Sequence, residues 1–174
     1  SVTISAEALA GYRVEGIYLD GTKITELTFV VGDKDYEVEA KHVANVYDVK
    51  FNANGGEEVE VVTYDVKYNE NITSPALSAF TQVGYTLKGF ALEASAVTAV
   101  YGFEATITVK ALADAKNMSA GTAEKQTIVV YAVWEANEFT VSYNGNGATG
   151  GEMTSSTFVY DQENKLTLNT YVRA

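Results

Sequence analysis

The feature that most constrains this 174-residue chain is a strand-and-turn pattern that occurs twice. The first copy covers residues 47–56, Tyr-Asp-Val-Lys-Phe-Asn-Ala-Asn-Gly-Gly, and the second covers residues 139–148, Phe-Thr-Val-Ser-Tyr-Asn-Gly-Asn-Gly-Ala. Apolar and polar residues alternate in both, which places the apolar ones on one face of a β-strand. The Asn/Gly end tolerates positive φ, as a tight turn requires. The copies start 92 residues apart, at 47 and 139, and such a repeat predicts a modular architecture.

Two further motifs recur. Residues 11–17 and 84–90 share the frame Gly-Tyr-x-apolar-x-Gly-apolar, and residues 38–42 align with residues 130–134 at the same offset of 92. We therefore predict the second half of one module over 1–44, a complete module over 45–137, and the first half of a third module over 138–174. On this division the two half-modules are complementary in type.

The remaining chain predicts mostly strands. Asp20-Gly21 between two apolar runs indicates a β-hairpin. Short strands are expected at 28–31 and 36–40, and the segment 59–68 should pair with the strand of the first repeat copy. The only plausible helix lies within 106–118, where Val109, Leu112 and Ala113 have helical spacing.

Composition excludes several classes of protein. Apolar residues make up 47% of the chain, which is enough for a folded core. The net charge of −11 disfavours nucleic acid and anionic membrane surfaces as partners. The chain has no cysteine, so disulfides, thiolate metal sites and cysteine catalysis are excluded. It contains no apolar run of about 18 residues, so we expect no membrane insertion.

Three motifs in order resemble the internalin-type B-repeat family and its divergent relatives. They are Val-Lys-Phe-Asn-Ala-Asn-Gly-Gly at 49–56, Gly-Tyr-Thr-Leu-Lys-Gly-Phe at 84–90, and Val-Tyr-Ala-Val-Trp at 130–134. The family consists of bacterial extracellular repeats with a β-grasp fold. The resemblance implies a mainly β fold of tandem β-grasp-like modules, with at most one short helix in each.

The same motifs predict the core of the complete module. Aromatic residues can fill a small core, since each can bury roughly 150–250 Å². The expected structural core residues are Phe51, Tyr85, Phe90, Tyr131 and Trp134. Phe90 and Ile17 replace the tryptophan that is usual in the family, and His42 replaces the closing tryptophan.

Candidate chemical sites are few. His42 is the only histidine, and without a recognisable nucleophile motif it favours a packed strand end over catalysis. Asp33, Asp35 and Glu37 offer oxygen ligands for calcium, or form a turn of solvated carboxylates. The acidic residues Glu57, Glu58 and Glu60 have the same two interpretations. The Asn-Gly pairs lack the Gly-Lys-Ser/Thr ending of a phosphate loop and are expected in turns.

These observations favour a non-catalytic repeat segment of a bacterial cell-surface or secreted protein. It would act as a spacer or adhesin module that displays binding domains, with no cofactor or metal. Its partners would be a protein or a glycan at the cell surface. Two alternatives stay open: a fibre subunit that associates head-to-tail through complementing half-modules, and a carbohydrate-binding module in which tyrosines stack on sugars.

Overall fold

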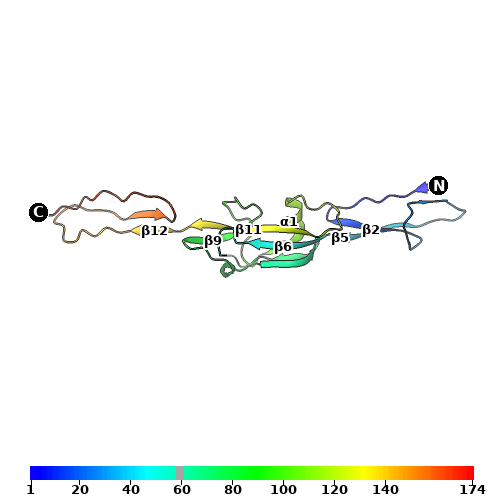
Figure 1. Cartoon of the computed structure of the whole chain (residues 1–174), viewed down its shortest axis with the longest axis horizontal. Helices are drawn as coiled ribbons and strands as arrows, with labels where there is room; N and C mark the ends of the chain where they lie inside the picture. Colours follow the sequence, from blue (N-terminus) through cyan, green and yellow to red (C-terminus); the bar gives the residue numbers. More distant parts are fainter. Residues whose placement is uncertain (58–60) are drawn as a thin grey trace.

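The computed structural model describes residues 1–57 and 61–174. The chain forms an elongated rod with its two termini at opposite ends (Figure 1). Strands dominate it, and one short α-helix lies near its middle, so the predicted mainly β class is confirmed.

The widest part of the rod is a four-stranded mixed sheet. Its strands are β6 (Val46–Asn52), β7 (Val61–Lys67), β9 (Tyr85–Ala91) and β11 (Gln126–Ala136). Their order is β7-β6-β11-β9. The central strands β6 and β11 are parallel, and each outer strand is antiparallel to its neighbour. A central parallel pair between two antiparallel outer strands is the order of a β-grasp sheet, and we call this part the complete module.

Short elements cover one face of this sheet and close its core. They are β8 (Asn71–Thr73), the 3₁₀ turn η1 (Leu77–Ala79), β10 (Thr106–Thr108) and α1 (Val109–Ala115). β8 and β10 pair with each other. Phe90 is fully buried, and its ring lies 5.1 Å from the Phe51 ring and 6.1 Å from the Phe80 ring, both edge-on. Buried aliphatic side chains from β6, β11 and α1 complete the cluster.

The helix follows the predicted apolar spacing but is shorter than the predicted segment. Val109, Leu112 and Ala113 are its buried residues, as expected. Residues 106–108 are strand β10 instead, because they pair with β8 and Thr108 then caps the helix. The Thr108 hydroxyl accepts a hydrogen bond from the Ala111 N–H, which satisfies one of the helix's free donors.

A three-stranded sheet precedes the complete module. It contains β2 (Tyr12–Leu19), β3 (Thr22–Ile24) and β5 (Val38–Ala44), in the order β3-β2-β5. We call it the N-terminal half-sheet. β2 and β3 form the predicted hairpin, with Asp20 and Gly21 both at positive φ. A separate pair joins β1 (Val2–Thr3) to β4 (Thr28–Phe29), so the strand expected over 28–31 is only two residues long.

A two-stranded sheet follows the complete module. β12 (Glu138–Val141) pairs antiparallel with β13 (Ser156–Val159), and we call this pair the C-terminal half-sheet. Residues beyond β13 return along its side, where Gly150 and Val172 form an isolated bridge. The predicted pairing of the 59–68 segment with β6 is confirmed over β7. Val59 and Glu60, the first two residues of the predicted segment, lie outside the described part of the chain, as does Glu58.

Each half-sheet repeats one part of the strand pairing of the complete module. β2 pairs with β5 as β9 pairs with β11, and both pairs shift register by one residue at the equivalent place. β12 pairs with β13 at the start as β6 pairs with β7: Phe139 faces Phe158 as Tyr47 faces Val66. The predicted division at 44/45 and 137/138 falls at single-residue breaks between consecutive strands.

Candidate functional site

Asn45 is the single residue between β5 and β6, and it is 1% exposed. Its N–H donates to the Gly11 carbonyl at 2.8 Å, and its carbonyl accepts from the Tyr68 N–H at 2.9 Å. The rings of Tyr12 and Tyr68 meet edge-on with 5.8 Å between centroids. These four residues tie the start of β2 to the end of β7, and we call them the first joint.

Asn137, the single residue between β11 and β12, repeats this arrangement. The Asn137 N–H donates to the Gly84 carbonyl at 2.9 Å, and its carbonyl accepts from the Tyr160 N–H at 2.8 Å. The rings of Tyr85 and Tyr160 meet edge-on with 5.6 Å between centroids. We call these four residues the second joint. Both joints therefore use one asparagine, one Gly-Tyr pair and one tyrosine in the same hydrogen-bonding pattern.

Each joint needs its glycine for two reasons. Gly11 and Gly84 have φ values of +78° and +76°, a region that side chains with a Cβ seldom adopt. A Cβ at Gly11 would lie 2.0 Å from the Tyr68 ring, and a Cβ at Gly84 would lie 2.3 Å from the Tyr160 ring. At each joint the tyrosine ring of the later sheet thus lies directly on the backbone of the preceding sheet, which leaves little room for the sheets to pivot.

A loop from the complete module braces the first joint. The Asn45 side-chain amide donates to the Ala120 carbonyl at 2.8 Å, and the Gly11 N–H donates to the Ser119 carbonyl at 2.6 Å. The hydroxyl of Tyr47, two residues after Asn45, donates to the Met118 carbonyl at 2.8 Å. Because the Asn45 side chain is buried, removing these bonds would leave polar groups without partners.

A charged cluster on α1 adds to this brace. The Tyr68 hydroxyl donates to Asp114 at 2.7 Å, and the Lys110 ammonium donates to Asp114 at 2.6 Å. Lys110 lowers the pKa of Asp114, and the Tyr68 hydroxyl lowers it further. Burial is the largest cause of the raised pKa of Tyr68. Asp114 and Lys110 are partly exposed, so water screens their attraction and its contribution to stability is modest.

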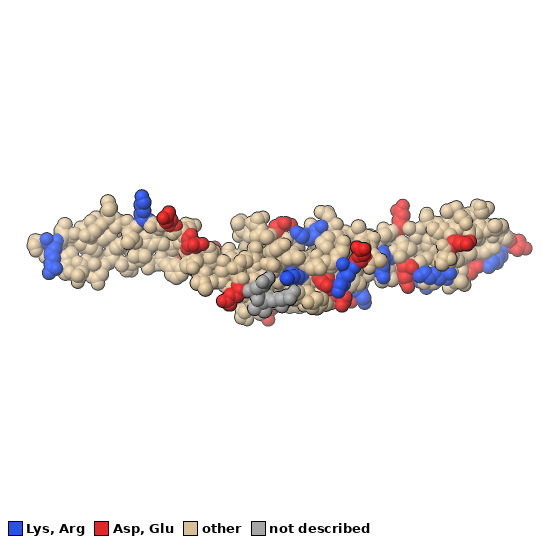
Figure 2. All heavy atoms as spheres, in the orientation of Figure 1, with Lys and Arg blue, Asp and Glu red and all other residues tan. Residues whose placement is uncertain are grey.

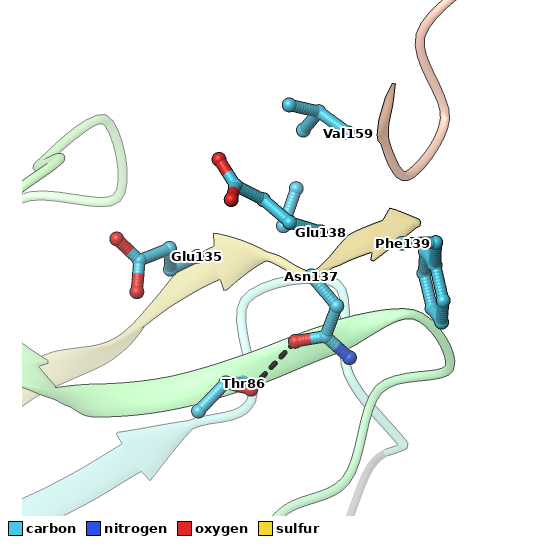
Figure 3. A pocket seen from close by; sticks show the side chains of 7 residues that line it. Thr86, Glu135, Asn137, Glu138, Phe139 and Val159 are labelled. Atoms are coloured by element: carbon cyan, nitrogen blue, oxygen red, sulfur yellow. Dashed lines mark hydrogen bonds between the residues drawn. The ribbon is translucent and has the colours of Figure 1, made fainter. Parts of the chain in front are cut away.

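The second joint has a cavity beside it. An open cavity of about 860 Å³ is lined by seven residues: Thr86, Glu135, Ala136, Asn137, Glu138, Phe139 and Val159. Figure 3 shows the Thr86 hydroxyl bonded to the Asn137 side chain, with the Glu135 and Glu138 carboxylates directed away from that bond. Glu135 also pairs with Lys88 at 2.8 Å. The lining contains two carboxylates and an exposed phenylalanine, with no hydroxyl-histidine pair.

The predicted core residues occupy different places. Phe51 and Phe90 lie inside the core cluster. Trp134 is half-buried against it, and its indole N–H donates to the Ala53 carbonyl at 2.8 Å. Tyr85 lies at the second joint. Tyr131 is half-buried and alternates along β11 with the core residues Val130 and Ala132.

The candidate chemical residues are scattered. His42 lies on β5, where its Nε2 is 3.0 Å from the Glu7 carbonyl oxygen. Asp33, Asp35 and Glu37 are exposed, and the Glu37 N–H donates to Asp20 at 2.9 Å. Over residues 1–57 and 61–174, no three His, Asp or Glu side chains group closely enough to hold a metal ion. No helix in this part of the chain is long and apolar enough to span a membrane.

Part of the complete module is similar to a known bacterial repeat. Residues 47–113 match the Listeria-Bacteroides repeat domain. The matched segment starts at Tyr47 in β6 and ends in α1, so it includes β6, β7 and β9 but not the central strand β11.

Two curated proteins of Evansella cellulosilytica are similar to this chain. One, named "Putative Gly-rich membrane protein", is 29% identical over 122 residues, which cover 70% of this chain and 12% of the relative. The other, named "Putative membrane protein", is 32% identical over 124 residues, which cover 66% of this chain and 16% of the relative. The chain thus spans less than a fifth of either relative. No solved structure gives a significant match.

Sequence reasoning assigned the Gly-Tyr pairs to the core and overlooked their place at the joints. Asn45, Asn137 and the tyrosines Tyr68 and Tyr160 recur at the offset of 92 that relates the other motifs. An asparagine repeated at the boundary of two strand patterns was the available signal. It did not reveal which residues accept its hydrogen bonds, because those lie far away in the sequence.

Proposed function

We propose that this chain is a non-catalytic spacer segment of a bacterial cell-surface or secreted protein. It would hold binding domains away from the cell or contribute to an adhesin. Its modules would be divergent members of the internalin-type B-repeat group. The observation that carries the proposal is the repetition of one stiff joint at both ends of the complete module.

Strand direction supports a spacer role. β5 leads through Asn45 into β6, and β11 leads through Asn137 into β12, so successive sheets follow one another along the rod (Figure 1). The chain takes two residue steps from Asn45 to Tyr47, which pairs with Gln126, and eleven more steps from Gln126 to Asn137. At ~3.3 Å for each of these thirteen steps, one module advances the chain by about 40 Å.

Each joint resists bending through direct contacts. Two backbone hydrogen bonds fix the asparagine on both sides, and an edge-on tyrosine pair packs across the junction. A flexible linker would instead expose its backbone and be rich in Gly and Ser. Here a single residue, Asn45 or Asn137, connects each pair of neighbouring sheets, so we infer that the two sheets keep a fixed relative orientation.

A surface location is supported by the relatives. The repeat domain that matches residues 47–113 is a bacterial repeat, and the similar proteins carry the word membrane in their names. Acidic side chains outnumber basic ones by 23 to 12, which suits a protein that must stay soluble and repel anionic surfaces. Figure 2 shows acidic and basic groups interspersed over the N-terminal and central parts of the rod.

Small-angle X-ray scattering can test the spacer role. A variant with residues 45–136 duplicated in tandem should be longer than the parent chain by about 40 Å in maximum dimension. A matched control carries the same duplication with Gly-Gly-Ser inserted after Asn137, and it should give a broader distance distribution. The proposal fails if the duplication adds far less length, or if the inserted residues leave the scattering unchanged.

A further inference from the structure

The two connections of the complete module determine how it would carry tension along the rod. The chain enters the module at Asn45, at the start of β6, and leaves it at Asn137, at the end of β11. β6 and β11 are parallel neighbours, and both run toward the end of the rod that holds the C-terminus (Figure 1). Tension along the rod therefore pulls β6 backward from its start and β11 forward from its end, so the two strands are driven to slide past each other.

This direction of pulling loads the whole contact between β6 and β11 at once. Six residue pairs join the two strands, from Tyr47 opposite Gln126 to Asn52 opposite Tyr131. The hydrogen bonds of a parallel pair are evenly spaced, so they share a load along the strands instead of breaking one after another. Because the strands are in direct contact, the load crosses from β6 to β11 and bypasses residues 53–125, which connect them in the sequence.

Buried side chains shield one face of this contact from water. Val49 and Phe51 of β6 and Ile128 and Val130 of β11 are each 0% or 1% exposed, and all four belong to the core cluster. Water that reaches a stretched hydrogen bond can replace one of its partners, which lowers the cost of breaking the bond. On its core side, the β6–β11 contact is closed to such competition.

Side-chain bonds hold the same two segments together at both ends of the contact. The Lys125 ammonium, just before β11, lies 3.0 Å from an Asp48 carboxylate oxygen of β6. At the other end, the Asn54 amide, just after β6, donates to the Ala132 carbonyl of β11 at 2.9 Å. The Trp134 indole of β11 also donates to the turn that follows β6. Sliding of β6 against β11 must stretch these bonds together with the backbone bonds.

We propose that the β6–β11 contact is a mechanical clamp, which keeps the complete module folded while the chain is under tension along the rod. The inference deepens the proposed spacer function and rests on it, since a segment that links two bodies is pulled in this way. Its evidence lies within the complete module and its two connections, Asn45 and Asn137.

The clamp also sets how far the spacer lengthens when a module unfolds. The chain takes 92 residue steps from Asn45 to Asn137. Fully extended at about 3.4 Å for each step, this segment spans roughly 310 Å. The folded module advances the chain by only about 40 Å, so its unfolding would add roughly 270 Å. Below the force at which the clamp yields, the spacer keeps its folded length.

Single-molecule pulling in two directions tests the clamp, because forced unfolding reports the unfolding rate of the pulled module. The chain has no cysteine, so thiols introduced at exposed residues can hold the handles. Ala40→Cys with Thr140→Cys applies tension along the rod and slides β6 against β11. Ala40→Cys with Glu124→Cys pulls on the starts of both strands, so their residue pairs open one at a time. At one pulling speed, the first geometry should need a several-fold higher unfolding force and should release roughly 270 Å.

Two glycine variants test which side-chain bonds carry the load. Asn54→Gly tolerates the φ of +49° and removes the amide bonds to the Ala94 and Ala132 carbonyls, so it should lower the unfolding force along the rod. Asn117→Gly is the matched control. Asn117 has a φ of +56° but follows α1, and within the described part of the chain its side chain makes no hydrogen bond. This variant should leave the unfolding force unchanged.

The clamp and the spacer role fail on different results. An unfolding force along the rod no higher than the force in the second geometry would overturn the clamp and leave the spacer role intact. Equal effects of the two glycine variants would overturn it as well. A duplicated chain that does not lengthen in X-ray scattering would instead overturn the spacer role, whatever force the module withstands.

Discussion

Gly84→Ala isolates the steric contact on which the second joint depends. A methyl group at this position meets two obstacles, the backbone φ of +76° and the Tyr160 ring 2.3 Å away. Gly21 is a matched control in the same chain. It has the same φ of +76°, but a Cβ added there meets nothing within 4 Å. The difference between the two alanine variants therefore measures the ring contact alone.

The expected magnitudes follow from the two obstacles. A left-handed backbone costs an alanine roughly 1–2 kcal/mol, which both variants should lose. Gly84→Ala must also displace Tyr160, whose edge-on packing against Tyr85 contributes about 0.5–1.5 kcal/mol beyond its buried area. We expect Gly84→Ala to lower the free energy of unfolding by about 1 kcal/mol more than Gly21→Ala.

Denaturant unfolding followed by tryptophan fluorescence measures this difference. Trp134 is the only tryptophan and lies on β11 beside β9, so its signal reports on the complete module. In a Tyr160→Ala background the ring is gone, and Gly84→Ala should then cost no more than Gly21→Ala. Equal losses for the two variants in the unaltered chain would refute the steric argument, as would an unchanged difference after Tyr160 is removed.

Three further outcomes are expected. Phe90→Ala should lower the free energy of unfolding by about 3–5 kcal/mol, because Phe90 is fully buried, and a loss below about 1 kcal/mol in a denaturant titration would show that the core is wrongly placed. Lys110 lowers the pKa of Asp114 below its value in the unfolded chain, so the stabilisation it gives is present at neutral pH and declines as pH falls below about 4. Asp114→Asn should flatten that part of the pH-stability curve, and a curve of unchanged shape would contradict the assignment. Thermal melts in EDTA and in millimolar calcium should coincide, whereas a rise of many degrees with calcium would indicate a site at Asp33 and Asp35.

Strand pattern and repeat spacing were enough to predict much of the complete module from sequence. Alternation over 47–51 defined the buried face of β6, and helical spacing defined the buried face of α1. Tertiary pairing decided the rest: residues 106–108 became a strand because β8 lies beside them. Long-range contacts of this kind carry no local signal.

The joints were harder to predict because their residues have two roles. From the sequence, the Gly-Tyr pair predicts a turn followed by an aromatic residue of the core. Leu87 and Phe90 of the same motif do lie in the core. The tyrosine itself packs outward on the next sheet, which belongs to a segment about 75 residues further along. Only the structure shows that Asn137 joins these two distant segments through its backbone.

The two joints should differ in how readily they open, although their backbone bonds match. The loop around Ala120 and the α1 cluster brace the first joint, whereas the second joint adjoins an open cavity. Each extra hydrogen bond contributes about 1 kcal/mol, so amide exchange at Tyr68 should be at least ~10-fold slower than at Tyr160, its counterpart.

Hydrogen exchange resolved by residue provides the measurement, and Asn45→Ala provides the control. Removing the Asn45 side chain deletes the bond to the Ala120 carbonyl but keeps both backbone bonds of the joint. Exchange at Tyr68 should then approach the rate at Tyr160, while the rate at Tyr160 itself stays the same. Equal protection of the two tyrosine amides in the unaltered chain would mean that the loop adds nothing to the joint. In that case the stiffness of the rod would have to come from the asparagine and the tyrosine pair alone.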